Sequence, residues 1–347
     1  MKKILLTGAA LLASVVSLQA QAQRDHISIV GSSTVYPFST VAAERFGRST
    51  NFATPKVEST GSGGGLRLFC NGVGSNTADI TNSSRRIKES EIELCAQNGV
   101  TDIVELMIGY DGIVLANSVK SQKIDINLKE LYMALAKVVP DPKNPQNLIN
   151  NPYKTWRQIN PAFPNVAIEV LGPPPTSGTR DAFVELGMEG GCNQFPTIKA
   201  MAKEDPKKHK AVCHGLREDG AFIEAGENDN LIVQKLAVTP GAFGIFGFSF
   251  LEENRDKVQG AKINGVEPEF DAISEGVYPV SRSMYVYAKK AHVGVIPGLQ
   301  EFLLEMTSKR AMGADGYMAE KGMITLVEKQ RKEVEEIART LRVMKAK

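Results

Sequence analysis

Small hydroxyl residues, a glycine and an arginine stand together in the stretch TSGTR at residues 176–180. The pattern that follows is helical, so these residues occupy the expected start of a helix. The first N–H groups of a helix have no partner inside it, and the helix dipole adds positive potential there. Hydroxyl groups, close backbone approach at a glycine and an arginine fork would together bind an anion. An ordinary N-cap followed by a surface arginine explains the same residues.

Three other turns in the chain repeat this chemistry. They are GSST at 31–34, GSGGG at 61–65 and NSSRR at 82–86, and each follows a β-rich stretch and precedes helical spacing. Open α/β sheets bind ligands at the carboxyl ends of their strands. Four such turns in one chain therefore favour a small anion surrounded by N–H and hydroxyl donors. Separate N-capping of four helices remains the alternative.

The elements that would carry these turns alternate between strand and helix. The expected strands are 26–30, 56–60, 103–118 (as one long bent strand or a buried pair), 165–172, 242–254 and 278–290, with an amphipathic helix at 128–139 and a polar loop at 140–156. Helices are expected after each hydroxyl-rich turn and through the C-terminal part of the chain. This alternation predicts an α/β fold with a mainly parallel sheet.

The length and charge of the chain limit its organisation and partners. Its 347 residues are many for a single core, so we expect two domains. The residues are 42% hydrophobic and 23% charged, as in ordinary globular proteins. Without Lys2 and Lys3, the 41 basic residues fall to 39 and equal the 39 acidic residues. A chain this close to neutral has no basic surface for nucleic acid, and any anion site must be local.

Residues 1–22 have the pattern of a secretory signal peptide. A basic start precedes an apolar stretch that ends in Ala20-Gln21-Ala22, a small-x-small cleavage site. The apolar run is short for a membrane span, and no cysteine follows it as a lipid attachment point. We therefore expect cleavage near Gln23 and a mature protein in an exported compartment.

The four cysteines agree with export. They allow three pairings, of which Cys70 with Cys95 and Cys192 with Cys213 are the simplest because they close local loops. Each bond would stabilise the fold by about 3 kcal/mol. Free thiols or a metal site are the alternatives. We expect no metal, because the spacings contain no CxxC and the histidines do not cluster with the cysteines.

Six stretches in chain order carry a family resemblance. GSSTVYPF, STGSGGGLRLFCNG, DITNSSR, TSGTRDAF, GAFGIFGFSF and YPVSRSMYVYAK resemble the periplasmic phosphate-binding proteins of the high-affinity phosphate ABC transporter. The resemblance implies an α/β, two-lobed periplasmic-binding-protein fold of type 2, a flytrap with two hinge crossovers. Lobe 1 would hold residues 24–115 and 280–347, and lobe 2 residues 116–279. The crossovers would lie near 115–118 and 278–282.

The resemblance also implies the residues that hold the phosphate. The matching residues are Ser33, Thr34, Ser62, Ser177, Gly178 and Thr179. Two positions depart from the family pattern. Pro173 stands where an arginine is usual, and Ser84 replaces an aspartate that accepts the proton of a protonated phosphate. Arg180, and Arg85 beside Ser84, are the candidates to replace the lost charge.

A protein of this family would be a monomer that captures inorganic phosphate without a cofactor and delivers it to the permease subunits of an ABC transporter in the inner membrane. Because Ser84 can donate as well as accept a hydrogen bond, it discriminates less than a carboxylate against fully deprotonated anions. Sulfate, molybdate and tungstate are therefore alternative ligands. A secreted adhesion or phosphatase-like protein on the same fold is a further alternative, although no GxSxG, HExxH or P-loop motif indicates an enzyme.

Overall fold

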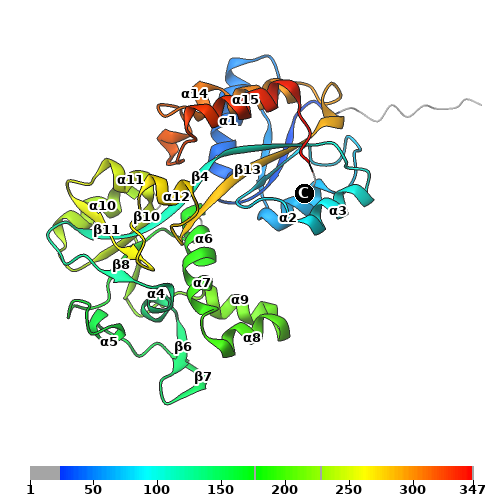
Figure 1. The fold of residues 1–347 in the computed structure, drawn as a ribbon. Coiled ribbons are helices and arrows are strands. Elements are labelled where there is room, and N and C mark those ends of the chain that lie inside the picture. Colours follow the sequence, from blue (N-terminus) through cyan, green and yellow to red (C-terminus); the bar gives the residue numbers. More distant parts are fainter. Residues whose placement is uncertain (1–23, 176, 227–228, 346–347) are drawn as a thin grey trace, which may run out of the picture.

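The computed structural model describes residues 24–175, 177–226 and 229–345. The predicted signal peptide at 1–22 and its cleavage site near Gln23 lie outside the described residues. The described chain forms two bodies that β4 (Ile103–Ser118) and β13 (Ser281–Lys289) connect (Figure 1). Within the described residues, no helix has both the length and the apolar character that a membrane span requires.

The first body contains the N-terminal strands and helices together with the C-terminal helices (Figure 1). Its elements are β1 (Ser28–Gly31), α1 (Tyr36–Ser49), β2 (Lys56–Ser59), α2 (Ser62–Phe69), β3 (Ile80–Ser83), α3 (Glu89–Gln97), the 3-10 helices η2 (Lys290–His292) and η3 (Ala319–Lys321), α13 (Leu299–Thr307), α14 (Lys309–Met312) and α15 (Glu328–Thr340).

The second body contains the middle of the chain. Its elements are β5 (Asp125–Ile126), α4 (Leu128–Leu135), β6 (Val138–Asp141), β7 (Asn144–Asn150), α5 (Trp156–Ile159), β8 (Val170–Gly172), α6 (Gly178–Ala182), the π-helix η1 (Phe183–Met188), α7 (Glu189–Cys192), α8 (Pro196–Glu204), α9 (Pro206–His214), β9 (Phe222–Glu224), α10 (Asp229–Val238), β10 (Phe243–Gly247), α11 (Phe248–Glu253), β11 (Val258–Gly260), β12 (Lys262–Ile263) and α12 (Phe270–Ser274).

The main sheet is parallel at both ends and antiparallel in the middle. Its strand order is β2-β1-β3-β13-β4-β10-β8-β9, with β11 paired to β4. Strand β1 is parallel to β2 and β3, and β8 is parallel to β9 and β10, whereas β4 is antiparallel to β13 and β10. The predicted α/β class is confirmed. The prediction of a mainly parallel sheet holds only for the outer strands, because the two strands that join the bodies run in opposite directions.

Strand β4 belongs to both bodies. Up to Gly112 it pairs with β13, where Gly112 lies opposite Ser281, and from Ile113 it pairs with β10, where Ile113 lies opposite Gly247. The sequence allowed either one long strand or two for this segment, and the structure has one. The change of partner lies close to the predicted crossover at 115–118. We keep lobe 1 (24–115 and 280–347) and lobe 2 (116–279) as a prediction.

Aromatic side chains mark a separate core in each body. In the first, Phe46 packs edge-on against Phe302 with ring centroids 5.4 Å apart. In the second, the ring centroid of the fully buried Trp156 lies 4.6 Å from that of Phe243. Helix α15 packs on β4 and α13 and buries Val334, so the C-terminal segment covers the first body as its amphipathic pattern predicts.

Three segments differ from the sequence predictions. The expected helix at 128–139 ends at Leu135, and Val138 and Val139 belong to β6. The expected loop at 140–156 contains a hairpin, in which β6 pairs with β7 and Val139 lies opposite Ile149. Its prolines and asparagines resemble a loop, and they are tolerated because this two-stranded sheet lies outside the main one. The expected strand at 242–254 ends at Gly247, and α11 follows without a connecting loop.

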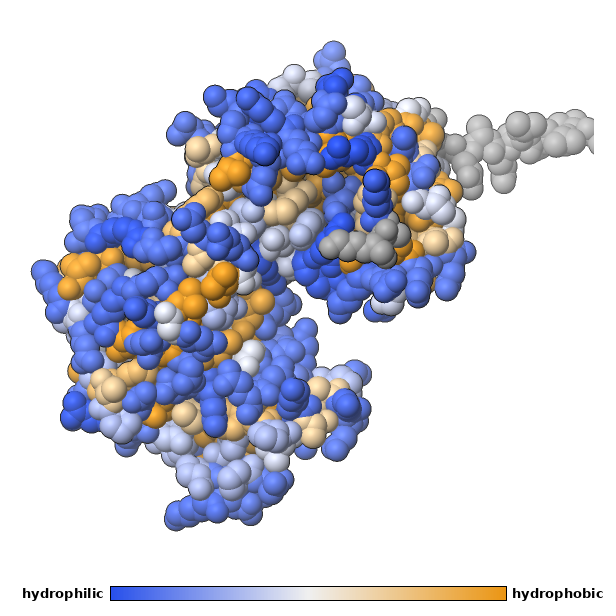
Figure 2. Space-filling model, in the orientation of Figure 1, coloured by the Kyte–Doolittle hydropathy of each residue, from blue (hydrophilic) through white to orange (hydrophobic). Residues whose placement is uncertain are grey.

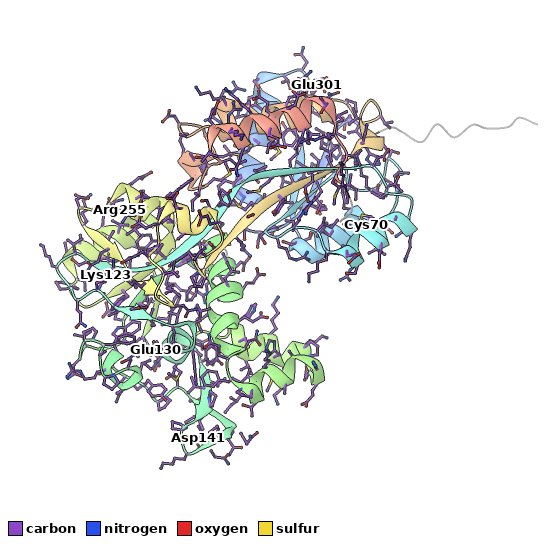
Figure 3. The ribbon with its side chains drawn as sticks, in the orientation of Figure 1. Cys70, Lys123, Glu130, Asp141, Arg255 and Glu301 are labelled. Atoms are coloured by element: carbon purple, nitrogen blue, oxygen red, sulfur yellow. A yellow bond between two sulfur atoms is a disulfide. The ribbon has the colours of Figure 1, made fainter. Side chains whose placement is uncertain are left out.

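Both predicted disulfide bonds are present. Cys70 and Cys95 link the end of α2 to α3, and Cys192 and Cys213 link α7 to α9. Figure 3 places Cys70 in the first body, far from the labelled Glu130 of α4 in the second. The expectation that no histidine lies near the cysteines was wrong. His209 Nε2 lies 3.3 Å from Cys213 Sγ, because residues four apart share one face of α9.

The two bonds provide a test of the lobe boundaries. Trp156 is the only tryptophan of the chain, so its fluorescence reports the second body. We expect the C192S/C213S variant to lower the unfolding free energy of this body by about 3 kcal/mol. The matched C70S/C95S variant should shift the far-UV circular dichroism transition and leave the tryptophan transition in place. Equal shifts of the tryptophan transition in urea for both variants would show that the two lobes unfold as one unit.

Candidate anion-binding site

Three of the hydroxyl-rich turns lie at one edge of the sheet. Strands β1, β2 and β3 are parallel neighbours, so the residues that follow them emerge on the same side. Ser62 and Ser84 are in direct contact, with their Oγ atoms 3.1 Å apart, and the backbone N–H of Ser84 donates to Ser62 Oγ at 3.1 Å. The turn NSSRR at 82–86 differs from the prediction, because α3 begins only at Glu89 and Ser84 lies in a bend directly after β3.

The turn of the second body meets this edge. Strand β8 is parallel to β10, and β10 ends at Gly247, opposite Ile113, where β4 changes partners. The carboxyl ends of both sets of parallel strands therefore face each other across residues 111–113. At this point Gly178 touches the turn GSST at 31–34, which follows β1 and is called the first turn below. A Cβ atom on Gly178 would lie 3.0 Å from the carbonyl oxygen of Ser33 and 3.1 Å from Cα of Thr34, so this approach favours glycine.

Gly178 begins a helix that contains α6, η1 and α7. Ser177 caps it, since its Oγ accepts the N–H of Thr179 at 3.2 Å. Thr34 lines an interlobe cavity of 770 Å³ together with residues 177–179. In Figure 2, residues of intermediate hydropathy gather where the two bodies meet. Thr34 of the turn GSST and Ser177, Gly178 and Thr179 of the turn TSGTR thus share one cavity.

The other predicted residues lie on the opposite side of this contact. Ser62, Ser84 and Arg85 line a second cavity of 700 Å³, and Ser33 lines a third of 260 Å³, where its Oγ donates to Asp181. The structure therefore brings the predicted residues to the junction of the lobes without placing them around a single cavity. Arg180 lines none of these three cavities.

The two arginines predicted from the sequence are engaged within their own lobes. Arg85 donates to both carboxylate oxygens of Glu91, at 2.9 and 2.7 Å, and these hydrogen bonds raise the pKa of Arg85. Arg180 donates to the carbonyl of Pro173 at 2.9 Å and stacks on the ring of Phe222 at 4.6 Å. Burial lowers the pKa of Arg180. Neither guanidinium is free in this arrangement.

Arg282 is a third arginine, which the sequence analysis did not single out. Its side chain is only 9% exposed at the start of β13, beyond the carboxyl end of β3. Its guanidinium donates to Glu185 at 2.7 Å and to Thr34 Oγ1, so it touches both lobes. Its position in the sequence could have indicated this role, because a hinge crossover was predicted to end at residue 282.

Four carboxyl-bearing residues line the same cavity as Thr34, of which Glu44 and Glu320 are exposed and Asp111 and Asp229 are largely buried. Asp229 is 6% exposed, and its Oδ2 accepts the N–H of Gly247 at 3.0 Å. Burial raises the pKa of Asp229 to about 6. Burial also raises the pKa of Asp111, and the charge of Arg282 opposes that shift. The cavity therefore combines hydrogen-bond donors with two largely buried acids, an arrangement that suits an anion carrying a proton.

Among the described residues, one group has the types and spacing of a metal site, namely Cys192, His209 and Cys213. Its two sulfur atoms are joined in a disulfide, so neither is a thiolate ligand in this state.

The raised pKa of Asp229 predicts a pH dependence of stability. The carboxyl titrates near 3.8 when unfolded and near 6 when folded, so its contribution is complete below pH 3.8 and is lost as the pH rises through 6. Asp229→Asn should therefore be more stable than the wild type by about 1–3 kcal/mol above pH 6. This gain in unfolding free energy should shrink towards pH 4. Urea unfolding of the ligand-free proteins at several pH values measures it. A gain that does not change with pH would contradict this assignment.

Comparison with known proteins identifies the fold family. A family model described as the PBP superfamily domain matches residues 17–310. Among solved structures, a possible phosphate-binding protein from Planctomyces limnophilus superposes with a TM-score of 0.71 at 24% identity, covering 91% of this chain and 98% of that one. A phosphate transport receptor from Vibrio cholerae gives 0.56 at 18% identity, covering 87% and 100%. These superpositions confirm the predicted fold.

Sequence relatives narrow the family further. Protein SphX of Synechococcus elongatus is 32% identical over 302 residues, which cover 84% of this chain and 77% of SphX. Phosphate-binding protein PstS of Staphylococcus saprophyticus is 28% identical over 301 residues, which cover 83% of this chain and 78% of PstS. The chain belongs to the PBP superfamily, in the family that contains SphX and the PstS phosphate-binding proteins.

Proposed function

We propose that this protein binds inorganic phosphate between its two lobes and supplies it to an ABC importer. The observation that carries the proposal is the contact of Gly178 with the first turn. This contact joins a capped helix start from one lobe to hydroxyl donors of the other, at the edge where both sets of parallel strands end. Relatives named as phosphate-binding proteins support the choice of anion.

Binding would use donors that the fold has already positioned. The hydroxyls of Thr34 and Ser177 and the N–H groups at the start of α6 would surround the anion, and Ser62 would join them only if the lobes moved, because it lines a separate cavity here. Micromolar affinity requires about 8 kcal/mol. About ten charge-assisted hydrogen bonds, each contributing a net 1–2 kcal/mol, are sufficient after ordering costs. Capture and release require no chemical step, which agrees with a family of binding proteins.

Arg282 is our choice for the main counter-charge of the ligand. It is nearly buried and already donates to Thr34, a predicted ligand residue. Arg85 and Arg180 are held by partners within their own lobes, whereas the partners of Arg282 lie in both lobes. Arg85 and Arg180 remain the secondary candidates.

The remaining parts of the proposal concern location and partners. The pattern of residues 1–22 supports export, and the two disulfides are typical of an oxidising compartment such as the periplasm. The family supports delivery to permease subunits in the inner membrane by a monomeric binding protein.

Titration calorimetry of the mature protein, freed of ligand by partial unfolding, tests the ligand. We expect micromolar or tighter binding of phosphate and no binding of sulfate or molybdate at pH 8. Equal binding of sulfate would show that the site does not recognise the ligand proton. Absence of binding to all three anions would contradict the transport proposal and favour an adhesion or enzymatic role.

A set of arginine variants tests the counter-charge. Arg282→Gln should weaken phosphate binding by about 10- to 100-fold, because it removes charge-assisted hydrogen bonds. Arg180→Gln and Arg85→Gln should have smaller effects. Arg255→Gln is the matched control, since Figure 3 places Arg255 on the outer surface of the second body. If Arg180→Gln weakens binding and Arg282→Gln behaves like the control, Arg180 is the counter-charge, as the sequence predicts.

A further inference from the structure

We propose that Asp111 selects a protonated ligand, by accepting a hydrogen bond from the phosphate hydroxyl. The inference rests on the proposed function and concerns the discrimination that Ser84 does not provide. A carboxylate offers only acceptors, so it bonds a hydroxyl of the ligand and repels an oxygen that carries no proton. Asp111 would therefore separate phosphate from sulfate, an anion of similar shape with no proton at neutral pH.

The position of Asp111 follows from the sheet. It lies on β4 directly opposite Arg282 of β13, one residue before the pairing with β13 ends. Strand β10 ends opposite Ile113 of β4, and β3 ends opposite Tyr285, which itself lies opposite Met107 of β4, so Asp111 lies between the ends of these two strands. The residue consequently lines the same cavity as Thr34 and residues 177–179. An anion held by these donors would lie beside the carboxylate.

Asp111 also has an unused acceptor. Its side chain is 16% exposed, but Oδ2 is buried and receives no hydrogen bond among the described residues. The nearest cationic atom is Nε of Arg282 at 3.6 Å, and this nitrogen likewise has no hydrogen-bond partner there. A buried acceptor without a donor costs free energy. A hydroxyl of a bound phosphate would satisfy it.

The neighbouring charged groups leave this role to Asp111. The other two nitrogens of the Arg282 guanidinium donate to Thr34, in the turn before α1, and to Glu185 on η1. Asp229 on α10 lines the same cavity, but its Oδ2 already accepts the N–H of Gly247. Two largely buried carboxyl groups beside one cavity disfavour a dianion unless a hydrogen bond offsets the repulsion. Sulfate cannot form that bond.

A simpler interpretation is that Asp111 only neutralises Arg282. The two interpretations differ in what Asp111→Asn does. Loss of a neutralising charge should strengthen the binding of phosphate and sulfate by the same factor. Loss of a proton-specific acceptor should change their ratio, because an amide can donate to an unprotonated oxygen.

The test is calorimetry with sodium phosphate and sodium sulfate at pH 8, on the full mature protein freed of ligand. We expect Asp111→Asn to lower the ratio of phosphate to sulfate affinity by about tenfold or more. Asp271→Asn on α12, an exposed residue near the same lobe boundary, is the matched control and should leave the ratio unchanged. Asp111→Ser provides a second variant should the asparagine variant not fold, as judged by its thermal transition.

Two outcomes would overturn the assignment. If Asp111 variants bind both anions more tightly by the same factor, or bind them as the wild type does, Asp111 does not select the ligand, although the phosphate proposal stands. If the wild type binds neither anion, the proposed function fails, and the role of Asp111 fails with it.

Discussion

The sharing of β4 between the two halves of the main sheet is the constraint on which the site depends. A strand has a fixed polarity, so pairing β4 with β13 up to Gly112 and with β10 from Ile113 fixes how the two lobes face each other. The carboxyl ends of the parallel strands are forced towards the same few residues. Helix starts, hydroxyl turns and hinge residues then meet without any long-range attraction between them.

Close contact at this junction limits the residues that can stand there. Gly178 lies against the backbone of the first turn, where any larger residue would push the lobes apart. The hydrogen bond from Ser33 to Asp181 joins the turn after β1 to α6, and the bond from Arg282 to Glu185 joins β13 to η1 of the same continuous helix. Because Arg282 is also proposed to hold the anion, we expect ligand binding to be coupled to the relative position of the lobes.

The predictions from the sequence succeeded where local pattern decides the structure. Three of the four hydroxyl-rich turns, the long strand at 103–118 and both disulfides depend on short-range spacing, and the structure contains them. The sequence analysis missed Arg282 and Asp111 because their roles depend on the register in which β13 pairs with β4. They are 171 positions apart in the chain and lie opposite each other only because β13 pairs with β4. The same limit explains why the β6–β7 hairpin was read as a loop, since its pairing is invisible in its composition.

Charge balance at the junction explains how selectivity can survive the loss of the family aspartate. An arginine alone would attract every oxyanion, and sulfate would compete with phosphate. Placing carboxyl groups beside the arginine reduces the net positive charge and leaves a hydrogen-bond acceptor that only a protonated ligand satisfies. Selectivity of this kind needs a carboxyl group at the cavity but not at one fixed position in the sequence. The serine at position 84 is therefore compatible with a phosphate site as long as another strand supplies the acceptor.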